Sequence, residues 1–185
     1  MIPTEEQARA LWDKYELPEK KRQHVMLVAR VAEFLARQID KATNQQINQS
    51  LLQASALLHD IDKNVEKLPG ERHPDAGVRI LREEGMGEVA EIVKTHSVHA
   101  ILDPAIIPKT WEEKLLFLAD KMVKQEVIGV DARFAQWDAE DLPASEIAML
   151  RRAYPNVKEL EKEVFDLIGI EAETCMRMIR EDRRG

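Results

Sequence analysis

Four ionisable side chains of this sequence occupy positions where apolar core residues would be expected. Each has apolar neighbours three or four positions away along a predicted helix: His24, His59, His96 and Asp120. A buried carboxylate such as that of Asp120 is costly unless it is protonated or bound to a cation. Helices that present imidazoles and carboxylates inward are a common way for all-α proteins to build metal centres. We therefore expect a metal site formed by His24, His59, Asp60 and Asp120. Its nitrogen and oxygen ligands suit Fe, Mn, Co, Ni or Zn.

The dipeptide His59-Asp60 restricts where this site can lie. Adjacent residues on an α-helix diverge by about 100°, so both can face one site only at its edge or where the helix ends. The next stretch, DKNVEKLPGER, contains the turn signal Pro69-Gly70 and predicts that the helix ends there. A single inward histidine is more often a hydrogen-bonded core residue than a ligand. Four such groups together favour the metal site.

Three further polar residues each allow two interpretations. His73 is either a helix-cap residue or a site residue, and His99 lies either on a surface loop or at the site. Lys63 is either a solvated loop lysine or a contact to a phosphate. The pattern alone leaves these alternatives open.

The composition is that of an ordinary globular protein. The chain has 185 residues, about one domain's worth, and 44% of them are hydrophobic. Its 27 basic and 34 acidic residues give a net charge of −7, so duplex nucleic acid is not an expected partner. The single cysteine, Cys175, excludes an intramolecular disulfide framework and favours a reducing, cytoplasmic location. We expect no membrane-spanning segment, because charged residues interrupt the most apolar stretch.

The hydrophobic periodicity predicts an all-α fold. Glycine and proline are scarce, with seven and eight residues, and period-two β-branched runs are absent. Two capping boxes, Thr4 with Gln7 and Thr110 with Glu113, mark helix starts. Helices are expected at about residues 4–15, 19–40, 48–60, 73–84, 88–97, 110–125, 156–169 and 171–183. Residues 131–143 are expected to form a loop.

We predict one domain over residues 1–185. It comprises a compact multi-helix core at about 19–128 and a helical extension at 129–185. Three aromatic residues, Trp111, Phe134 and Trp137, are expected to be packing residues, with a base-stacking pocket as the less favoured alternative.

The ordered motifs resemble the HD superfamily of metal-dependent phosphohydrolases over roughly residues 20–125. They are His24, LLHDIDK at 57–63, RHPDAG at 72–77, KTH at 94–96 and LAD at 118–120. The two additional histidines are similar to the branch with a dinuclear centre, which includes the bacterial symmetrical diadenosine tetraphosphate hydrolases. The resemblance implies that His24, His59, Asp60 and Asp120 hold one metal ion. It also implies that Asp60, shared between the ions, holds a second with His73 and His96.

The sequence departs from that branch at Asp62, where a small residue is usual, and in the segments that follow His96 and Asp120. These differences leave the dinucleotide substrate open. The residues expected to act in catalysis are Asp60, Lys63 and His99. We expect Lys63 to offset charge on the phosphoryl group, and either His99 or Asp62 to protonate the leaving oxygen.

The expected function is hydrolysis of a phosphoester or phosphoanhydride bond in a small nucleotide-type substrate, with one or two divalent transition metal ions. The expected partner is therefore a small phosphorylated molecule, and a homodimer stays an open option. A metal- or nucleotide-binding sensor domain without turnover is the main alternative. A helical scaffold with merely packed histidines is the third.

Overall fold

The structure is a computed structural model and describes residues 1–181. In this part of the chain the secondary structure is helical, apart from one isolated antiparallel bridge between Val123 and Val127. The predicted all-α class is confirmed. The elements, in chain order, are α1 (Glu5–Lys14), α2 (Glu19–Ala42), α3 (Gln49–Leu58), α4 (Asp75–Glu83), α5 (Gly87–Lys94), the 3₁₀ turn η1 (Val98–Leu102), α6 (Trp111–Met122), α7 (Val130–Ala139), α8 (Ala144–Ile168) and α9 (Ala172–Glu181).

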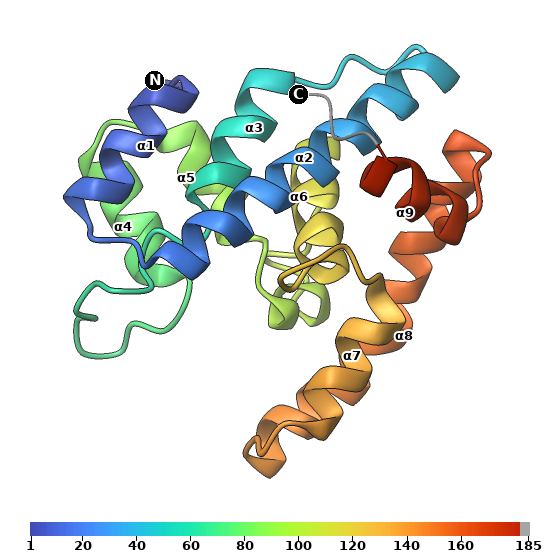
Figure 1. Ribbon diagram of the computed structural model, residues 1–185. Coiled ribbons are helices and arrows are strands. Elements are labelled where there is room, and N and C mark those ends of the chain that lie inside the picture. Colours follow the sequence, from blue (N-terminus) through green and yellow to red (C-terminus); the bar gives the residue numbers. More distant parts are fainter. Residues whose placement is uncertain (182–185) are drawn as a thin grey trace.

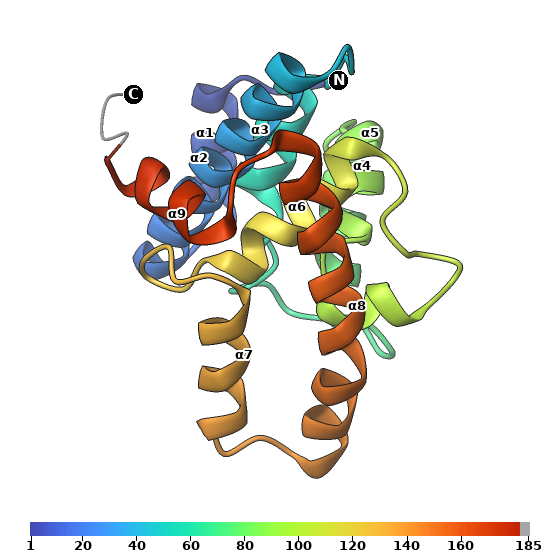
Figure 2. The same ribbon diagram turned by 90° about the vertical axis from the view of Figure 1, so that its right-hand side faces the viewer.

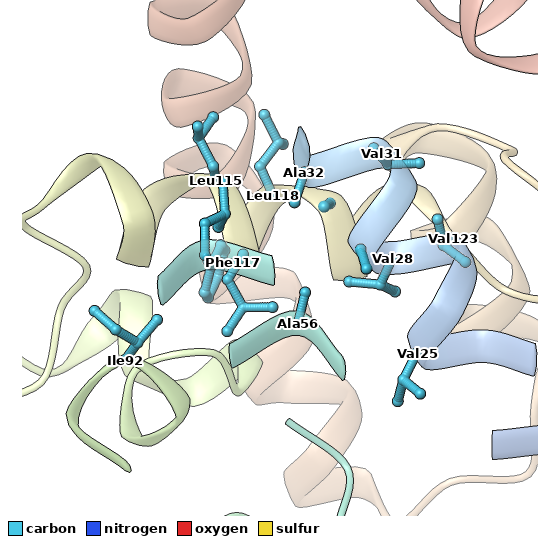
Figure 3. Close-up of a cluster of buried hydrophobic side chains, with 14 of the residues drawn as sticks. Val25, Val28, Val31, Ala32, Ala56, Ile92, Leu115, Phe117, Leu118 and Val123 are labelled. Carbon is cyan, nitrogen blue, oxygen red and sulfur yellow. The ribbon is translucent and has the colours of Figure 1, made fainter. Parts of the chain in front are cut away.

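The long helix α2 crosses the bundle, and α3 and α6 pack against it (Figure 1). Its buried face repeats every three to four residues, which is the spacing of an amphipathic helix. Figure 3 shows residues of that face in one apolar cluster with side chains from α3, α5 and α6. The buried residues of α2 are Val25, Val28, Ala29, Val31, Ala32, Phe34, Leu35, Ala36 and Ile39. This apolar contact fixes the relative positions of the helices that carry the chemistry.

Both predicted capping boxes are present. The side chain of Thr4 accepts a hydrogen bond from the backbone N–H of Gln7, and the side chain of Thr110 accepts one from the N–H of Glu113. In return, each of these N3 side chains accepts a hydrogen bond from the backbone of its capping threonine. Because these bonds satisfy donors that a helix start leaves unpaired, α1 and α6 begin where the sequence indicates.

The extension differs from the prediction at α7, which is a helix where a loop was expected. Val130, Phe134 and Trp137 are spaced four and three residues apart and lie on one helical face. Phe134 is buried and meets the rings of Trp137 and Tyr154 edge to face, with centroids 5.1 Å apart in both pairs. The apolar contact with α8 therefore stabilises a helix where the sequence predicted a loop.

Helix α8 also begins earlier than expected, at Ala144 instead of Asn156. Proline at position 155 lies inside the helix. A proline removes one backbone hydrogen bond, but buried residues on both sides of it, Ala153 and Val157, keep the helix packed on the bundle. Figure 2 shows α7 and α8 as an antiparallel pair that projects from the bundle, with the second half of α8 returning along α6.

The other helix ends lie closer to the predicted bounds. Helix α5 ends at Lys94, before His96, and α6 ends at Met122. Helix α9 lies within the predicted 171–183, whose last two residues are outside the described part of the chain. Within residues 1–181, no helix is both long enough and apolar enough to cross a membrane.

Candidate metal centre

The six residues expected as metal ligands come together from five separate parts of the chain. His24 lies on α2 and Asp120 on α6, while His59 and Asp60 directly follow the last residue of α3. The predicted end of α3 at the dipeptide is thus confirmed. His73 precedes α4, and His96 follows α5. All of them except His59 line one cavity of about 590 Å³. The side chain of His59 is fully buried.

Within the described residues, two sets of side chains could each hold a metal ion. The first is His24, His59 and Asp60, and the second is Asp60, His73 and His96. In each set the ligand atoms lie within 4.8 Å of one another. Asp60 belongs to both sets, so its carboxylate lies between two neighbouring positions for a cation.

Asp120 faces the first set. Its Oδ1 lies 3.0 Å from Nε2 of His24 and 3.6 Å from Nε2 of His59. Its Oδ2 accepts a hydrogen bond of 2.5 Å from Nζ of Lys121. One carboxylate oxygen is therefore directed at the first set, and the other is held by a buried lysine.

The four histidines are all fixed through Nδ1. Backbone carbonyl oxygens lie within hydrogen-bond distance of Nδ1 in three of them: Lys124 at 3.0 Å from His24, Ala56 at 2.7 Å from His59 and Val93 at 2.6 Å from His96. In the fourth, Oδ1 of Asp62 lies 2.9 Å from Nδ1 of His73. A carbonyl oxygen only accepts, so each of these contacts places the proton on Nδ1 and leaves a lone pair on Nε2. Metal-binding histidines are typically held in this way.

The Nε2 atoms that result are poorly satisfied by protein groups alone. Among residues 1–181, the buried Nε2 of His59 has no hydrogen-bond partner. Nε2 of His73 and Nε2 of His96 lie 3.0 Å apart and face each other. Two lone pairs directed at each other repel, whereas a cation shared between them would satisfy both. The residues present therefore fit divalent metal ions.

The electrostatics favour ionised carboxylates at the centre. Burial raises the pKa of Asp60, but His59, Lys63 and Lys21 outweigh it and hold that pKa far below its usual range. Burial also raises the pKa of Asp120, and Lys121 and His24 lower it well below normal. Burial, together with His73 and His59, keeps the pKa of His96 well below its usual value. Anionic oxygen and the neutral imidazole of His96 are forms that bind metals. At His59, by contrast, burial is outweighed by Asp60 and Asp120, which raise its pKa.

A family model described as the HD domain matches residues 22–124, more than half of the chain. The chain belongs to the HD domain family. The matched range contains all six expected ligands. Searches of curated proteins and of solved structures found no match.

Two of the three expected catalytic residues of this HD domain lie beside the ligands. Lys63 lines the cavity, and its Nζ lies 3.2 Å from Oδ1 of Asp60. His99, on η1, also lines the cavity. Burial lowers the pKa of His99, and Arg72 adds to the effect, so its ring is mainly neutral near pH 7. The third residue, Asp60, is the shared ligand.

Asp62 is placed differently from the alternative role considered for it. Its side chain is fully buried and is not among the residues that line the cavity. Its carboxylate contacts Nδ1 of His73 and does not face the cavity. The structure therefore does not place Asp62 where it could protonate a leaving oxygen. Of the two candidates for that step, His99 is the one that faces the cavity.

Sequence reasoning singled out Lys63 but not two other basic residues that contact this centre, Lys21 and Lys121. Lys21, on α2, donates to Oδ2 of Asp60 at 2.8 Å. Lys121 is buried, and its Nζ donates to the backbone oxygen of His96 at 2.6 Å. The sequence signal that could have identified Lys121 is its position directly after Asp120, as a second charged residue in an apolar stretch. Lys21 lies three residues before His24, on the same helical face.

The aromatic residues divide between packing and the cavity. Trp137 lines the cavity, whereas Phe134 is a core residue and Trp111 lies against Lys114, 5.0 Å from its Nζ. Trp137 is therefore the one of these three aromatic residues that lines the cavity beside the expected ligands.

Proposed function

We propose that this HD domain protein is a metal-dependent phosphohydrolase that cleaves a phosphoester or phosphoanhydride bond of a small nucleotide-type substrate. The observation that supports this most strongly is the convergence of four Nε2 atoms on the carboxylates of Asp60 and Asp120. They meet beside a cavity that lysines also line. Metal ligands together with cationic side chains suit a phosphorylated substrate better than a neutral one.

Two divalent ions would be held in this arrangement. His24, His59, Asp60 and Asp120 would bind one, and Asp60, His73 and His96 the other, as the resemblance to the dinuclear branch implies. Such ions supply two effects when bound: they lower the pKa of water and offset charge on phosphate oxygens.

We assign the other two catalytic roles, charge stabilisation and the hydrogen bond to the leaving oxygen, to side chains of the protein. Lys63 is close enough to Asp60 to hydrogen-bond an oxygen of a phosphoryl group placed there, and so to offset the charge that develops on it. His99 offers an imidazole outside both ligand sets, and we assign to it the hydrogen bond to the leaving oxygen. The cavity volume of about 590 Å³ is within the range of small-molecule sites, which agrees with a nucleotide-sized substrate.

The test combines metal analysis with turnover. Protein purified without added metal is analysed for bound transition metals, and it is then assayed against nucleotides, dinucleoside polyphosphates and cyclic dinucleotides. We expect about two equivalents of metal per chain and hydrolysis of at least one class. The double variant His59→Ala/Asp60→Ala should lose both metal and activity.

Three results would contradict the proposal. A metal-free protein would remove the basis for the chemistry. Hydrolysis that persists unchanged in the double variant would place the activity elsewhere. Stoichiometric metal with no turnover on any of these phosphorylated compounds would favour the sensor domain.

A further inference from the structure

A second feature of the cavity is an arginine from the extension whose hydrogen-bonding capacity is unused. Arg133, on α7, lines the cavity together with the metal-ligand residues. Its Nε and Nη1 atoms are buried, and neither has a hydrogen-bond partner in the part of the chain that the structure describes. A guanidinium has five N–H donors, and leaving buried donors unpaired costs free energy. Such a group suggests a ligand that accepts these bonds.

The guanidinium of Arg133 lies against an aromatic ring. Its central carbon lies 4.1 Å from the ring centroid of Trp137, one helical turn further along α7. A stacked guanidinium loses fewer degrees of freedom when a ligand binds, and its planar fork matches two oxygens of a phosphate. Burial lowers the pKa of Arg133, while Asp120, Glu140 and Asp60 act in the opposite direction. These carboxylates are near enough to interact with Arg133, yet it forms no ion pair with them among the described residues.

Five other basic residues line the cavity, and four of them are already engaged in ion pairs; the fifth, Lys20, is exposed. Lys21 and Lys63 contact Asp60, Lys121 contacts Asp120, and Lys124 contacts Glu140. Arg133 differs from these four because no carboxylate among residues 1–181 pairs with it, and it differs from Lys20 because its unpaired donor atoms are buried.

The total charge points to a substrate with more than one phosphate. Six lysine and arginine side chains and four carboxylates line the cavity, an excess of two positive charges before any metal is bound. Two divalent ions would add four more. A single terminal phosphate carries about two negative charges at neutral pH, which leaves most of this charge unmatched. A compound with linked phosphates brings further negative oxygens to the same cavity.

We propose that Arg133 binds a second phosphate of the substrate, adjacent to the phosphoryl group at the metal centre, and that the substrate class is therefore nucleoside diphosphates and longer polyphosphates. This inference rests on the proposed function for the position of the first phosphate. It assigns the extension, through α7, a direct part in substrate selection.

The test compares two ligands that differ by one phosphate. Binding of α,β-methylene-ADP, which resists hydrolysis, and of AMP is measured by calorimetry on the purified protein with its native metal content. The variants are Arg133→Gln, which removes the charge, and Arg133→Lys, which keeps the charge but loses the planar fork. Arg151→Gln serves as the matched control, because Arg151 is an exposed arginine of α8 that pairs with Asp138 and does not line this cavity.

We expect Arg133→Gln to weaken binding of the diphosphate analogue by about tenfold or more and that of AMP by less than about twofold. Arg133→Lys should lie between wild type and Arg133→Gln, and Arg151→Gln should bind both ligands as wild type does. Circular dichroism will show folded variants, because removing an unpaired buried charge is not expected to destabilise the domain.

An equal loss for both ligands would overturn the proposal by placing Arg133 at the cleaved phosphoryl group. Unchanged binding of both would overturn it by removing Arg133 from the site. This binding measurement needs no turnover, so it tests the role of Arg133 separately from the proposed function. If Arg133→Gln selectively weakens binding of the diphosphate analogue but the protein hydrolyses none of the compounds, the hydrolase proposal fails and the role of Arg133 stands.

Discussion

The carboxylate of Asp62 accepts a hydrogen bond of 2.9 Å from Nδ1 of His73, and its side chain is fully buried. This contact fixes the ring of His73, orients its Nε2 toward His96 and makes that nitrogen a stronger ligand. A carboxylate at this position replaces the small residue that the resemblance would lead one to expect. Asp62 is thus a positioning residue for the second metal position.

We predict that Asp62→Ala weakens binding of the second metal ion and leaves the first nearly unchanged. Loss of such a hydrogen bond typically lowers metal affinity by about 10- to 100-fold. Titration of metal-free protein with Mn²⁺, followed by calorimetry, should resolve one tight and one weakened site. Asp103→Asn is the control, because the exposed side chain of Asp103 only accepts a bond from the backbone of Ala105. Equal weakening of both sites, or of neither, would remove this role from Asp62.

Lys63 provides a second prediction, which concerns catalysis and not metal content. Lys63→Ala should lower kcat by about tenfold to a thousandfold on the substrate found in the turnover screen, since it removes a cation that stabilises developing charge. Bound metal should stay at the wild-type level, because no Nζ atom is a ligand. Lys67→Ala, an exposed lysine of the same loop, should behave as wild type. A wild-type kcat in Lys63→Ala would mean that Lys63 only pairs with Asp60.

Much of the centre could be predicted from sequence because its ligands follow local rules. His24 and Asp120 interrupt apolar helical faces, and the pattern around residue 60 marks the end of α3. The capping threonines fix the helix starts in the same way. Each of these signals depends on residues within about one or two helical turns.

The remaining features depend on contacts between distant segments. Asp62 meets His73 only because the loop at 63–72 returns to the end of α3, and no local pattern encodes that return. Arg133 reaches the cavity because apolar contacts hold α7 against α8, where the sequence predicted a loop. Gly129 adds a local requirement, because it starts α7 with a φ of +84° and a Cβ there would lie 2.8 Å from the sulfur of Met176.

Trp12 connects α1 to α3, the helix that His59 directly follows, and this contact leads to a prediction about the free energy of unfolding. Its buried Nε1–H donates to the backbone oxygen of Leu57 at 2.8 Å, in the last turn of α3. Trp12→Phe keeps a ring but leaves that oxygen unpaired, so the free energy of unfolding should fall by about 1–3 kcal/mol. Urea denaturation followed by circular dichroism measures the change. Trp111→Phe, whose ring lies partly exposed near Lys114, should change it by less than about 1 kcal/mol. A neutral Trp12→Phe would show that the bond does not stabilise the end of α3.

The last prediction concerns pH and the buried thiol of α9. Burial raises the pKa of Cys175 to about 12, whereas a thiol in an unfolded chain ionises near pH 8.5. Because ionisation then favours the unfolded chain, the stability that the neutral thiol contributes is complete below about pH 8.5 and falls as the pH rises toward 12. Relative to Cys175→Ala, the free energy of unfolding of the wild type should drop by about 2 kcal/mol between pH 7.5 and pH 10.

Urea denaturation of both proteins across this range isolates the effect of the thiol, because every other titrating group is common to them. A thiol reagent provides an independent readout at pH 8, where the folded wild type should not react and the unfolded chain should react once. A difference between the two proteins that stays constant with pH, or rapid labelling of the folded wild type, would show that α9 does not bury Cys175 against the bundle.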